Sequence, residues 1–523
     1  MLRLSSYVHD RFVEGTGPGQ TLRSPVDGAE VAWADAEGVD RGAALAYARE
    51  VGGRSLRALT FAQRGELLAA LSRSVHGLRD ELLDLSRASY GATRGDGKFD
   101  VDGASGTLAH YAALGAKLGP RSVLLDGEAD PVGRSSRFVG QHLWVPRAGV
   151  AVHVDAFNFP AWGMAEKLAA CLLAGMPALV KPAVATSPVA WRVVRAWSEQ
   201  GLLPPGVLSL LVGPVGDLLD HLGPQDVVAF TGSSDTGRTI RGHRRVVELG
   251  VPVNVEADSL NAAVLGPDVG PGEPTFEMFL ADVVRDLTQK AGQKCTATRR
   301  IVVPEALLDA VREGITDLLG RARTGDPDAR DTVVGPVSTA QQLRDVNAGV
   351  AVLAGTAEVF VASADPLPEG GCWVRPQVFL ARGGVDAPFV HDHEVFGPVA
   401  AVVPWGGDAA TAAAIVARGG GTLVTSLYTD DEAFAAEVIA GIAPWTGRIY
   451  WGSRKVADQG VGPGTVLPGF VHGGPGKAGG GQELGGLRGL ALYQQRLAVQ
   501  GDRALLDRVL GADPAGPVGR PAS

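Results

Sequence analysis

Short apolar runs alternate with amphipathic segments between residues 150 and 258, and this alternation constrains the fold more than any other feature of the sequence. The runs are apolar on both faces, so the strands that they form must be covered by helices on both sides. The pattern therefore predicts βαβ units and a doubly wound, Rossmann-like parallel sheet, which binds ligands beyond the carboxyl ends of its strands. The expected strands are 150–157, 177–183, 207–213, 227–232 and 251–258, with helices near 163–175, 186–200, 215–222 and 235–243.

A second α/β pattern follows from residue 259 to residue 447, and the N-terminal ~120 residues are predicted to be mostly helical. The clearest helical segment is 60–91, where apolar residues recur at three- and four-residue steps and give one apolar face. Thr60 and Gln63 fit a capping box, and Gly91 fits a C-terminal stop. The strands expected in the second pattern are 300–304, 357–362 and 400–405.

Two further segments, 135–146 and 491–500, alternate polar and apolar residues as exposed strands do. Each would either pair with a partner subunit or pack as a hairpin on its own subunit, and the pattern leaves both alternatives open.

Composition excludes several classes of protein. A formal charge of −9 argues against general nucleic-acid binding, which needs basic patches. Three cysteines far apart in the sequence build no disulfide framework and favour a reducing cytoplasm. The longest apolar run, 168–180, is shorter than the ~20 residues of a membrane span, and the N-terminus lacks the apolar core of a signal peptide. We therefore expect a cytoplasmic protein that binds neither nucleic acid nor membrane.

Cys295 is the candidate nucleophile. Most single cysteines are inert core residues, but Cys295 has small or polar neighbours and follows a helix end, in a loop. Lys294 would favour the reactive thiolate. Cys171 lies in an apolar helix and is assigned to the core, whereas Cys372 lies in a loop with no evident partner.

A nucleophile of this kind needs a base and a group that stabilises an oxyanion, and two predicted strand ends offer them. Glu256 ends an apolar strand, where an acid without a role is costly to bury, although it could equally be a paired surface acid. Asn158 also follows a strand, but an asparagine before Phe-Pro is often only a turn former. The glycines of 230–237 follow a strand and open a helix whose free N–H groups would favour a phosphate, although such a segment can also be only a tight turn. Lys181 ends another predicted strand and would reach a cofactor, although a solvated lysine is the alternative.

Six segments taken in order resemble the aldehyde dehydrogenase superfamily, and the resemblance extends from the N-terminal helices almost to the C-terminus. It implies an enzyme with a Rossmann-like cofactor domain, an α/β catalytic domain and a protruding β oligomerisation arm, and a homodimer as the expected assembly. The matching segments are FNFP (157–160), LVKPA (179–183), FTGS (230–233), Glu256, GQKC (292–295) and EVFGP (394–398).

The resemblance implies a role for each matching residue. Cys295 would attack a small-molecule aldehyde, Asn158 and the Cys295 backbone N–H would hold the oxyanion, and Glu256 would activate the water that hydrolyses the thioester. Hydride would pass to a nicotinamide, which must converge with the nucleophile. The implied cofactor-binding residues are Lys181, Gly232, Ser233, Glu394, Phe396 and Phe157.

The chain departs from the family pattern at two places. The family's glutamate motif continues with a glycine pair, whereas here Glu256 is followed by Ala257 and Asp258, which affects the placement of this glutamate. Many NAD-dependent members carry an acid three residues after the KPA lysine, where this chain has Val184. Without that acid a 2′-phosphate is not repelled, and Lys181 would attract it. We therefore predict NADP as cofactor, with NAD as the alternative.

A narrower likeness appears to members that oxidise a semialdehyde attached to a CoA thioester in the degradation of aromatic compounds. They include the dehydrogenase half of bifunctional ring-opening enzymes, and on this resemblance we expect the hydratase-like domain of those enzymes to be missing here. The loop 472–482, with His472 and Lys477, is expected to be flexible and to border a large substrate's entrance; a plain surface loop is the alternative. Three other functions stay open: oxidation of free aldehydes, a CoA-acylating dehydrogenase, and a catalytically silent protein on the same fold.

The expected organisation follows from these assignments. No metal is expected, because the nearest ligand cluster, residues 391–394, consists of adjacent side chains that diverge on a strand. The expected parts are a cofactor-binding domain at 1–134 and 147–257, a catalytic domain at 258–447, oligomerisation strands at 135–146 and 485–502, a glycine-rich bridging loop region at 448–484 and a tail at 503–523. The last part of this tail, residues 511–523, is expected to be disordered.

Overall fold

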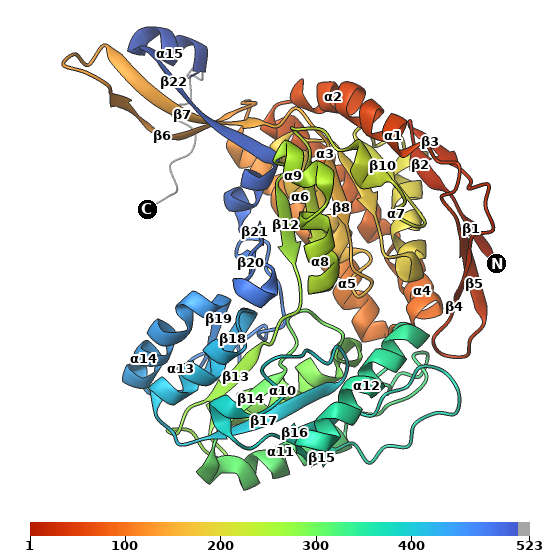
Figure 1. Ribbon diagram of the computed structural model, residues 1–523, viewed down its shortest axis with the longest axis vertical. Coiled ribbons are helices and arrows are strands. Elements are labelled where there is room, and N and C mark those ends of the chain that lie inside the picture. Colours follow the sequence, from red (N-terminus) through yellow and green to blue (C-terminus); the bar gives the residue numbers. More distant parts are fainter. Residues whose placement is uncertain (511–523) are drawn as a thin grey trace.

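The computed structural model describes residues 1–510 and has two α/β lobes and a protruding arm (Figure 1). The first lobe contains a seven-stranded sheet in the order β12-β11-β8-β9-β10-β2-β3. The five strands predicted from the sequence pair in parallel within it, as expected. Their bounds are β8 (Ala151–Val154), β9 (Ala178–Lys181), β10 (Leu208–Leu210), β11 (Val227–Thr231) and β12 (Val253–Glu256).

Both faces of this sheet are apolar. Along β9, Leu179 packs into one core cluster and its neighbours Ala178 and Val180 pack into the other. One predicted helix, 215–222, is wrong: this segment forms only a 3₁₀ turn, η3 (Leu218–His221), because Pro214 and Pro224 leave too few residues for a longer helix. The helices of this region are α6 (Trp162–Ala174), α7 (Ser187–Glu199), α8 (Ser234–Arg241) and α9 (Arg244–Leu249).

The N-terminal segment is only partly helical, in contrast to the prediction. Its first 34 residues contain five short strands, two of which extend the first sheet through the antiparallel pair Tyr7 and Leu210. Such strands are set by distant partners, so local periodicity does not reveal them. These strands are β1 (Leu2–Leu4), β2 (Ser6–Val8), β3 (Arg11–Val13), β4 (Gln20–Arg23) and β5 (Glu30–Ala34), and β1-β5-β4 form a separate sheet.

The segment 60–91 is two helices, not one, because the chain leaves helical geometry at Leu78. The capping box of Thr60 and Gln63 is confirmed, and Gly91 ends the second helix with φ of 71°. The helices between residues 41 and 118 are α1 (Arg41–Tyr47), α2 (Gly53–Arg57), α3 (Phe61–Gly77), α4 (Arg79–Tyr90) and α5 (Arg94–Leu118).

The second lobe contains another seven-stranded sheet, in the order β15-β16-β17-β14-β13-β18-β19. The three strands predicted here are confirmed as β14, β15 and β17, whereas β19 falls inside the segment predicted as a bridging loop. The strands are β13 (Ala262–Leu265), β14 (Arg300–Pro304), β15 (Glu358–Ala362), β16 (Gln377–Leu380), β17 (Val399–Trp405), β18 (Thr422–Tyr428) and β19 (Thr446–Gly452); the helices are α10 (Pro274–Thr288), α11 (Leu308–Gly320), α12 (Ala340–Thr356), α13 (Ala409–Arg418) and α14 (Glu432–Ile442).

The hairpin of β20 (Val471–Gly473) and β21 (Gln482–Leu484) joins the lobes. It contacts β12 of the first sheet and β19 of the second, and Figure 1 shows it between them. Part of the glycine-dense segment is therefore an ordered hairpin, which places the side chains of His472 and Glu483 in the interior of the protein.

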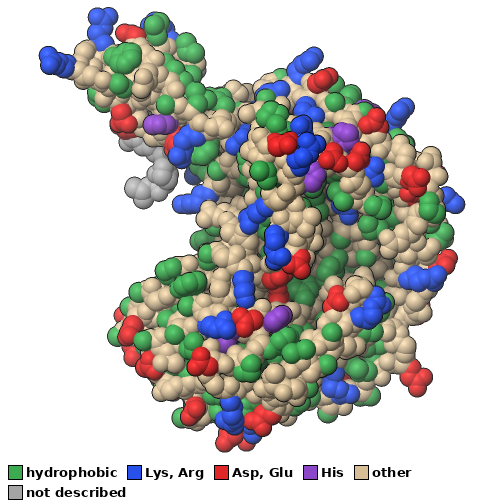
Figure 2. Space-filling view, viewed as in Figure 1, with side chains coloured by type: hydrophobic (Ala, Val, Ile, Leu, Met, Phe, Trp, Pro, Cys, Tyr) green, Lys and Arg blue, Asp and Glu red, His purple; other side chains and the backbone are tan. Residues whose placement is uncertain are grey.

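The arm is a three-stranded antiparallel sheet in the order β22-β7-β6, and it stands clear of the body (Figures 1 and 2). Both predicted exposed strands lie in it for most of their length, as β7 (Phe138–Pro146) and β22 (Gln494–Asp502), which pair along their whole length. The residues just before β22, predicted to belong to the second strand, instead form a 3₁₀ helix, η9 (Gly486–Tyr493), whose Leu490 and Tyr493 are buried in the first lobe. The third strand, β6 (Leu124–Pro131), was assigned from the sequence to the cofactor-binding domain; this is corrected by its pairing with β7.

The predicted tail begins as a helix, α15 (Arg503–Leu510), and its remainder, 511–523, lies outside the described residues. Within the described chain, no helix combines the length and the apolar character needed to cross a bilayer. On the face drawn in Figure 2, basic and acidic side chains are interspersed.

Candidate active site

The loop that carries Cys295 is held in a strained conformation. After α10 the chain passes through three consecutive left-handed residues, Lys290 (φ 55°), Ala291 (φ 50°) and Gly292 (φ 68°). Left-handed geometry costs a non-glycine residue about 1–2 kcal/mol and persists only where its surroundings enforce it. Here the Lys290 N–H donates to Asp96 Oδ1 (2.9 Å), and a Cβ at position 292 would lie 2.1 Å from the backbone oxygen of Gly397. These contacts fix the position of the loop.

Cys295, Glu256 and His472 converge from three distant parts of the chain. Glu256 ends β12, His472 lies in β20, and their ligand atoms and the Cys295 sulfur all lie within 4.8 Å of one another. The distance between His472 Nε2 and Glu256 Oε2 is 3.1 Å, and that between His472 Nε2 and Cys295 Sγ is 3.8 Å. His472 is buried, so the expectation of a flexible loop at the substrate entrance is wrong for this residue.

Asn158 faces the same cavity as these three residues. It follows β8, is buried, and donates through Nδ2 to the Gln293 backbone oxygen (3.1 Å), two residues before Cys295. Asn158, Glu256 and Cys295 all line this cavity, so the structure brings the three predicted catalytic residues together. Its lining comprises Ala156, Asn158, Phe159, Trp162, Gly163, Glu166, Lys167, Thr231, Glu256, Cys295, Thr296, Gly464, Val466 and His472.

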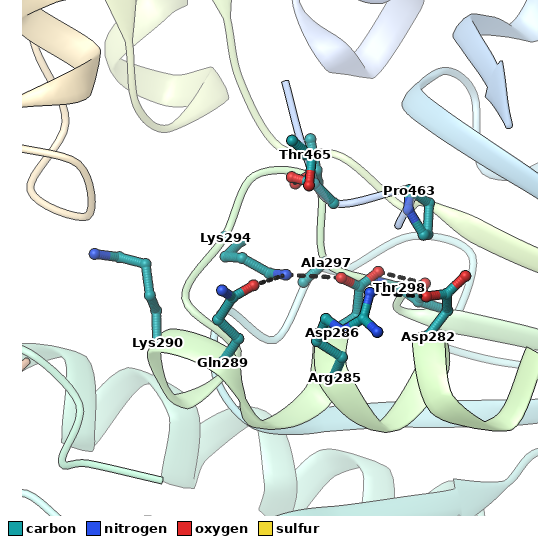
Figure 3. A network of polar contacts seen from close by, with 12 residues as sticks. Asp282, Arg285, Asp286, Gln289, Lys290, Lys294, Ala297, Thr298, Pro463 and Thr465 are labelled. Atoms are coloured by element: carbon teal, nitrogen blue, oxygen red, sulfur yellow. Dashed lines mark hydrogen bonds and ion pairs between the residues drawn. The ribbon is translucent and has the colours of Figure 1, made fainter. Parts of the chain in front are cut away.

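Lys294, expected to favour the Cys295 thiolate, has a different role. Its buried ammonium pairs with Asp286 Oδ1 (2.7 Å) and donates to Gln289 Oε1 (2.9 Å), both from α10 and its end (Figure 3). Asp286 also accepts from the Thr298 hydroxyl (3.0 Å). The lysine therefore ties the cysteine loop to α10 and leaves the thiol without this cation.

Replacing Lys294 with methionine is expected to lower the free energy of unfolding by ~3–5 kcal/mol, because it leaves the carboxylate of Asp286 buried and uncompensated. Lys455→Met is the matched control, since Lys455 pairs with Glu432 on the surface at 3.5 Å and should cost less than ~1 kcal/mol. Urea unfolding followed by tryptophan fluorescence checks this, and equal losses in both variants would contradict it.

The charges around the thiol oppose its ionisation. Burial and the carboxylates of Glu256 and Glu166 raise the pKa of the Cys295 thiol. Burial alone would also raise the pKa of Glu256, but the charge and hydrogen bond of His472 outweigh it and lower that pKa. Burial lowers the pKa of His472, but the charge and hydrogen bond of Glu256 together with the charge of Glu166 outweigh it and raise that pKa. Burial raises the pKa of Glu166 to about 8, so Glu166 is largely protonated at neutral pH.

A buried polar network borders the cavity, and the sequence analysis missed it. The Lys167 ammonium donates to the Thr231 hydroxyl (2.7 Å) and pairs with Glu483 (3.3 Å), whose other oxygen accepts from Asn254 (3.0 Å). Burial raises the pKa of Asp155, which lies 4.0 Å from Lys167, to about 6. The available signal was the polar pair Glu166–Lys167 at the start of an otherwise apolar helix.

The first group of predicted cofactor residues lies at the carboxyl ends of β9 and β11. Ser233 caps α8 by accepting from the Thr236 N–H, and the Gly232 N–H donates to the Glu256 backbone oxygen (3.1 Å). Lys181 ends β9 and donates to the Pro182 backbone oxygen (2.9 Å). Burial lowers the pKa of this lysine, so an anion placed beside it would relieve an electrostatic cost.

The second group, Phe157, Glu394 and Phe396, lies in the loop after β8 and in the segment before β17. The Phe157 and Phe396 rings meet edge to face, with centroids 5.8 Å apart. Glu394 pairs with Arg299 (3.0 Å) and accepts from the Ser259 N–H (3.0 Å). Burial raises the pKa of Glu394 to about 7, and its charge in turn contributes to the raised pKa of Cys295. The predicted nucleotide residues thus extend up to the nucleophile.

Residues 391–394 form a turn and a loop, not the strand expected from the sequence. His391 contacts Arg300 (3.2 Å) and Asp392 pairs with Arg418 (2.9 Å), so each side chain has its own partner. Lys477 also contacts Asp392 (3.6 Å) and is therefore held against the second lobe. Cys171 and Cys372 are both buried in apolar clusters, which confirms the core assignment for Cys171 and gives Cys372 a packing role.

The chain matches the family model for aldehyde dehydrogenases over residues 12–496. It therefore belongs to the aldehyde dehydrogenase family, and its class of activity is the NAD(P)-dependent oxidation of an aldehyde. An aldehyde dehydrogenase from Bacillus cereus solved with NAD⁺ has the same fold, with a TM-score of 0.81 and 21% identity over 96% of this chain and 97% of that one. The predicted fold class is thereby confirmed.

Two curated relatives are informative. The chain is 42% identical to 3,4-dehydroadipyl-CoA semialdehyde dehydrogenase of Aromatoleum evansii over 481 residues, which are 91% of this chain and 93% of that protein. It is 27% identical to the alpha-ketoglutarate semialdehyde dehydrogenase of Haloferax volcanii over 453 residues, 84% of this chain and 89% of that protein. The first similarity confirms the narrower likeness seen in the sequence.

Proposed function

We propose that this protein oxidises a CoA-linked semialdehyde to the carboxylic acid, with NADP as the preferred cofactor, in the aerobic degradation of aromatic compounds. The observation that carries the proposal is the convergence of Cys295, Glu256 and Asn158 on one buried cavity. The similarity to the semialdehyde dehydrogenase of Aromatoleum evansii supports the substrate class.

The chemistry follows from these side chains. The Cys295 sulfur attacks the aldehyde carbon, and the Asn158 amide and the Cys295 backbone N–H stabilise the oxyanion of the adduct. A nicotinamide, when bound, supplies the acceptor for the hydride that leaves this adduct. Glu256 then takes a proton from the water that hydrolyses the Cys295 thioester. An acid that is ionised at neutral pH suits this step, and the lowered pKa of Glu256 provides one.

The residues at the carboxyl ends of β9 and β11 fit a dinucleotide. Ser233 and the N-terminus of α8 would hold the diphosphate. A Cβ at the preceding position, Gly232, would lie 2.5 Å from Phe230 Cζ, so a glycine is favoured in the turn that leads into α8. Lys181 would contact the adenosine ribose. Glu394 and Phe396 would contact the nicotinamide ribose, with Phe157 beside them.

The cofactor preference predicts kcat/KM for NADP about 10- to 100-fold above that for NAD, the range expected of one added charged hydrogen bond between Lys181 and a 2′-phosphate. Val184→Glu should remove the preference for NADP, because the added carboxylate repels the 2′-phosphate. Val184→Gln, which places an uncharged side chain of the same shape as glutamate there, should retain the preference. Steady-state kinetics with both cofactors check this, and a clear preference of the wild type for NAD would refute it.

The substrate class is tested by comparing CoA-linked and free semialdehydes of matched chain length, without added CoA. We expect acid and reduced cofactor to form, with kcat/KM at least ~10-fold higher for the CoA-linked compound if the CoA moiety adds even one charged contact. Activity that requires free CoA would identify an acylating dehydrogenase, against which Glu256 argues. Equal rates with the CoA-linked and the free semialdehyde would indicate a general aldehyde dehydrogenase. If neither NADP nor NAD were reduced, the protein would be a catalytically silent member of the fold.

We also propose that the protein is a homodimer in the cytoplasm, and the arm supports the dimer. Its outer strand β22 is mostly exposed, and Phe138, Leu497 and Leu505 present apolar side chains to solvent. An unpaired strand edge with apolar side chains is a surface that a second subunit can cover.

A further inference from the structure

The thiol of Cys295 needs a cation nearby, because burial and several carboxylates oppose its ionisation. Lys294 does not supply this cation, because its ammonium pairs with Asp286. Arg448 influences the thiol, but its guanidinium donates to the backbone oxygens of Thr465 (2.8 Å) and Pro463 (2.7 Å). His472 is the group whose nitrogen lies at contact distance from the sulfur.

We propose that His472, in its imidazolium form, stabilises the Cys295 thiolate and so positions and activates the nucleophile. Its Nε2 lies 3.1 Å from a Glu256 oxygen and 3.8 Å from the Cys295 sulfur. The imidazolium can therefore stabilise both the Glu256 carboxylate and the Cys295 thiolate. The proposal rests on the proposed function, in which Cys295 is the nucleophile.

The ionisation step involves only the thiol. The S–H bond breaks, its electron pair stays on the Cys295 sulfur, and the proton leaves to solvent, while Glu256 stays ionised and His472 keeps its proton. No oxidant or reductant takes part. An opposite charge within ~4–6 Å lowers the pKa of an acid by about 1–3 units.

His472 is set in this place by the hairpin. β20 and β21 pair His472 with Glu483, and Glu483 in turn binds Lys167. The raised pKa of His472 agrees with an imidazolium at neutral pH, since the charge and hydrogen bond of Glu256 and the charge of Glu166 together outweigh the effect of burial. The ionisable groups around His472 are Glu256 from β12, Glu166 and Lys167 from α6, Cys295 from the loop after α10, Arg448 from β19 and Glu483 from β21.

The test is the pH dependence of Cys295 alkylation by iodoacetamide, followed by mass spectrometry of its peptide in the full chain. His472→Gln keeps an N–H donor but lacks the charge, and we expect its midpoint to lie about 1–3 pH units above that of the wild type. His76→Gln, an exposed histidine on α3, should leave the midpoint unchanged. An unchanged or lower midpoint in His472→Gln would overturn the proposal.

A second measurement needs no variant and covers the case in which His472→Gln fails to fold. In the wild type, the rate with anionic iodoacetate relative to neutral iodoacetamide should fall as His472 loses its proton with rising pH. A ratio constant across the titration would overturn the proposal. Both measurements are made without aldehyde or nucleotide, so their outcome is independent of whether the proposed substrate is oxidised.

Discussion

Replacing Cys295 with alanine is expected to lower kcat for aldehyde oxidation by at least ~10⁴-fold, because no covalent adduct can then form. The sulfur lies at the cavity shared with Asn158 and Glu256, and the other cysteines of the chain are buried in apolar clusters elsewhere. Steady-state formation of reduced cofactor measures the loss.

Two controls make this result specific. Cofactor affinity of Cys295→Ala, measured by calorimetry, should remain close to that of the wild type, because the proposed nucleotide contacts come from other residues. Cys372→Ala removes a thiol packed in the second lobe and should retain most of the activity. Turnover retained by Cys295→Ala would refute the nucleophile.

Replacing Glu256 with glutamine is expected to lower steady-state kcat by ~10²–10⁴-fold, since the amide cannot take a proton from the hydrolytic water. The first turnover should survive, because hydride transfer precedes hydrolysis, so rapid mixing should show a burst of reduced cofactor followed by a stall. Loss of the burst would mean that Glu256 acts before hydride transfer.

The sequence predicted the elements whose signal is local. The strands β8 to β12 follow from their apolar pattern. The positions of Asn158 and Glu256 follow because Glu256 ends β12 and Asn158 follows the end of β8, and both strands flank β11 in one sheet. Adjacent parallel strands carry their carboxyl ends to a common edge, so residues that close such strands meet there. The strands at residues 2–34 escaped prediction because their partners are distant, as in the pairing of Tyr7 with Leu210.

The site residues that the sequence analysis missed or misinterpreted have contacts that only the tertiary structure creates. His472 is 177 positions from Cys295, and only the folding of the hairpin between the two sheets brings them together. Lys294 is adjacent to Cys295 in sequence, yet its side chain extends to Asp286 on α10. Proximity in the sequence therefore suggested Lys294 as the cation near the thiol, and this was wrong. The contact between His472 and Cys295 is visible only in the structure.

The most direct test of the whole account is the intact mass of Glu256→Gln after one exposure to substrate aldehyde and NADP. The account predicts a mass increase equal to one acyl group, localised to the Cys295 peptide, with about one equivalent of reduced cofactor per subunit, as expected of an acyl-enzyme that accumulates before hydrolysis. Reduced cofactor without an adduct, or an adduct on another residue, would contradict it.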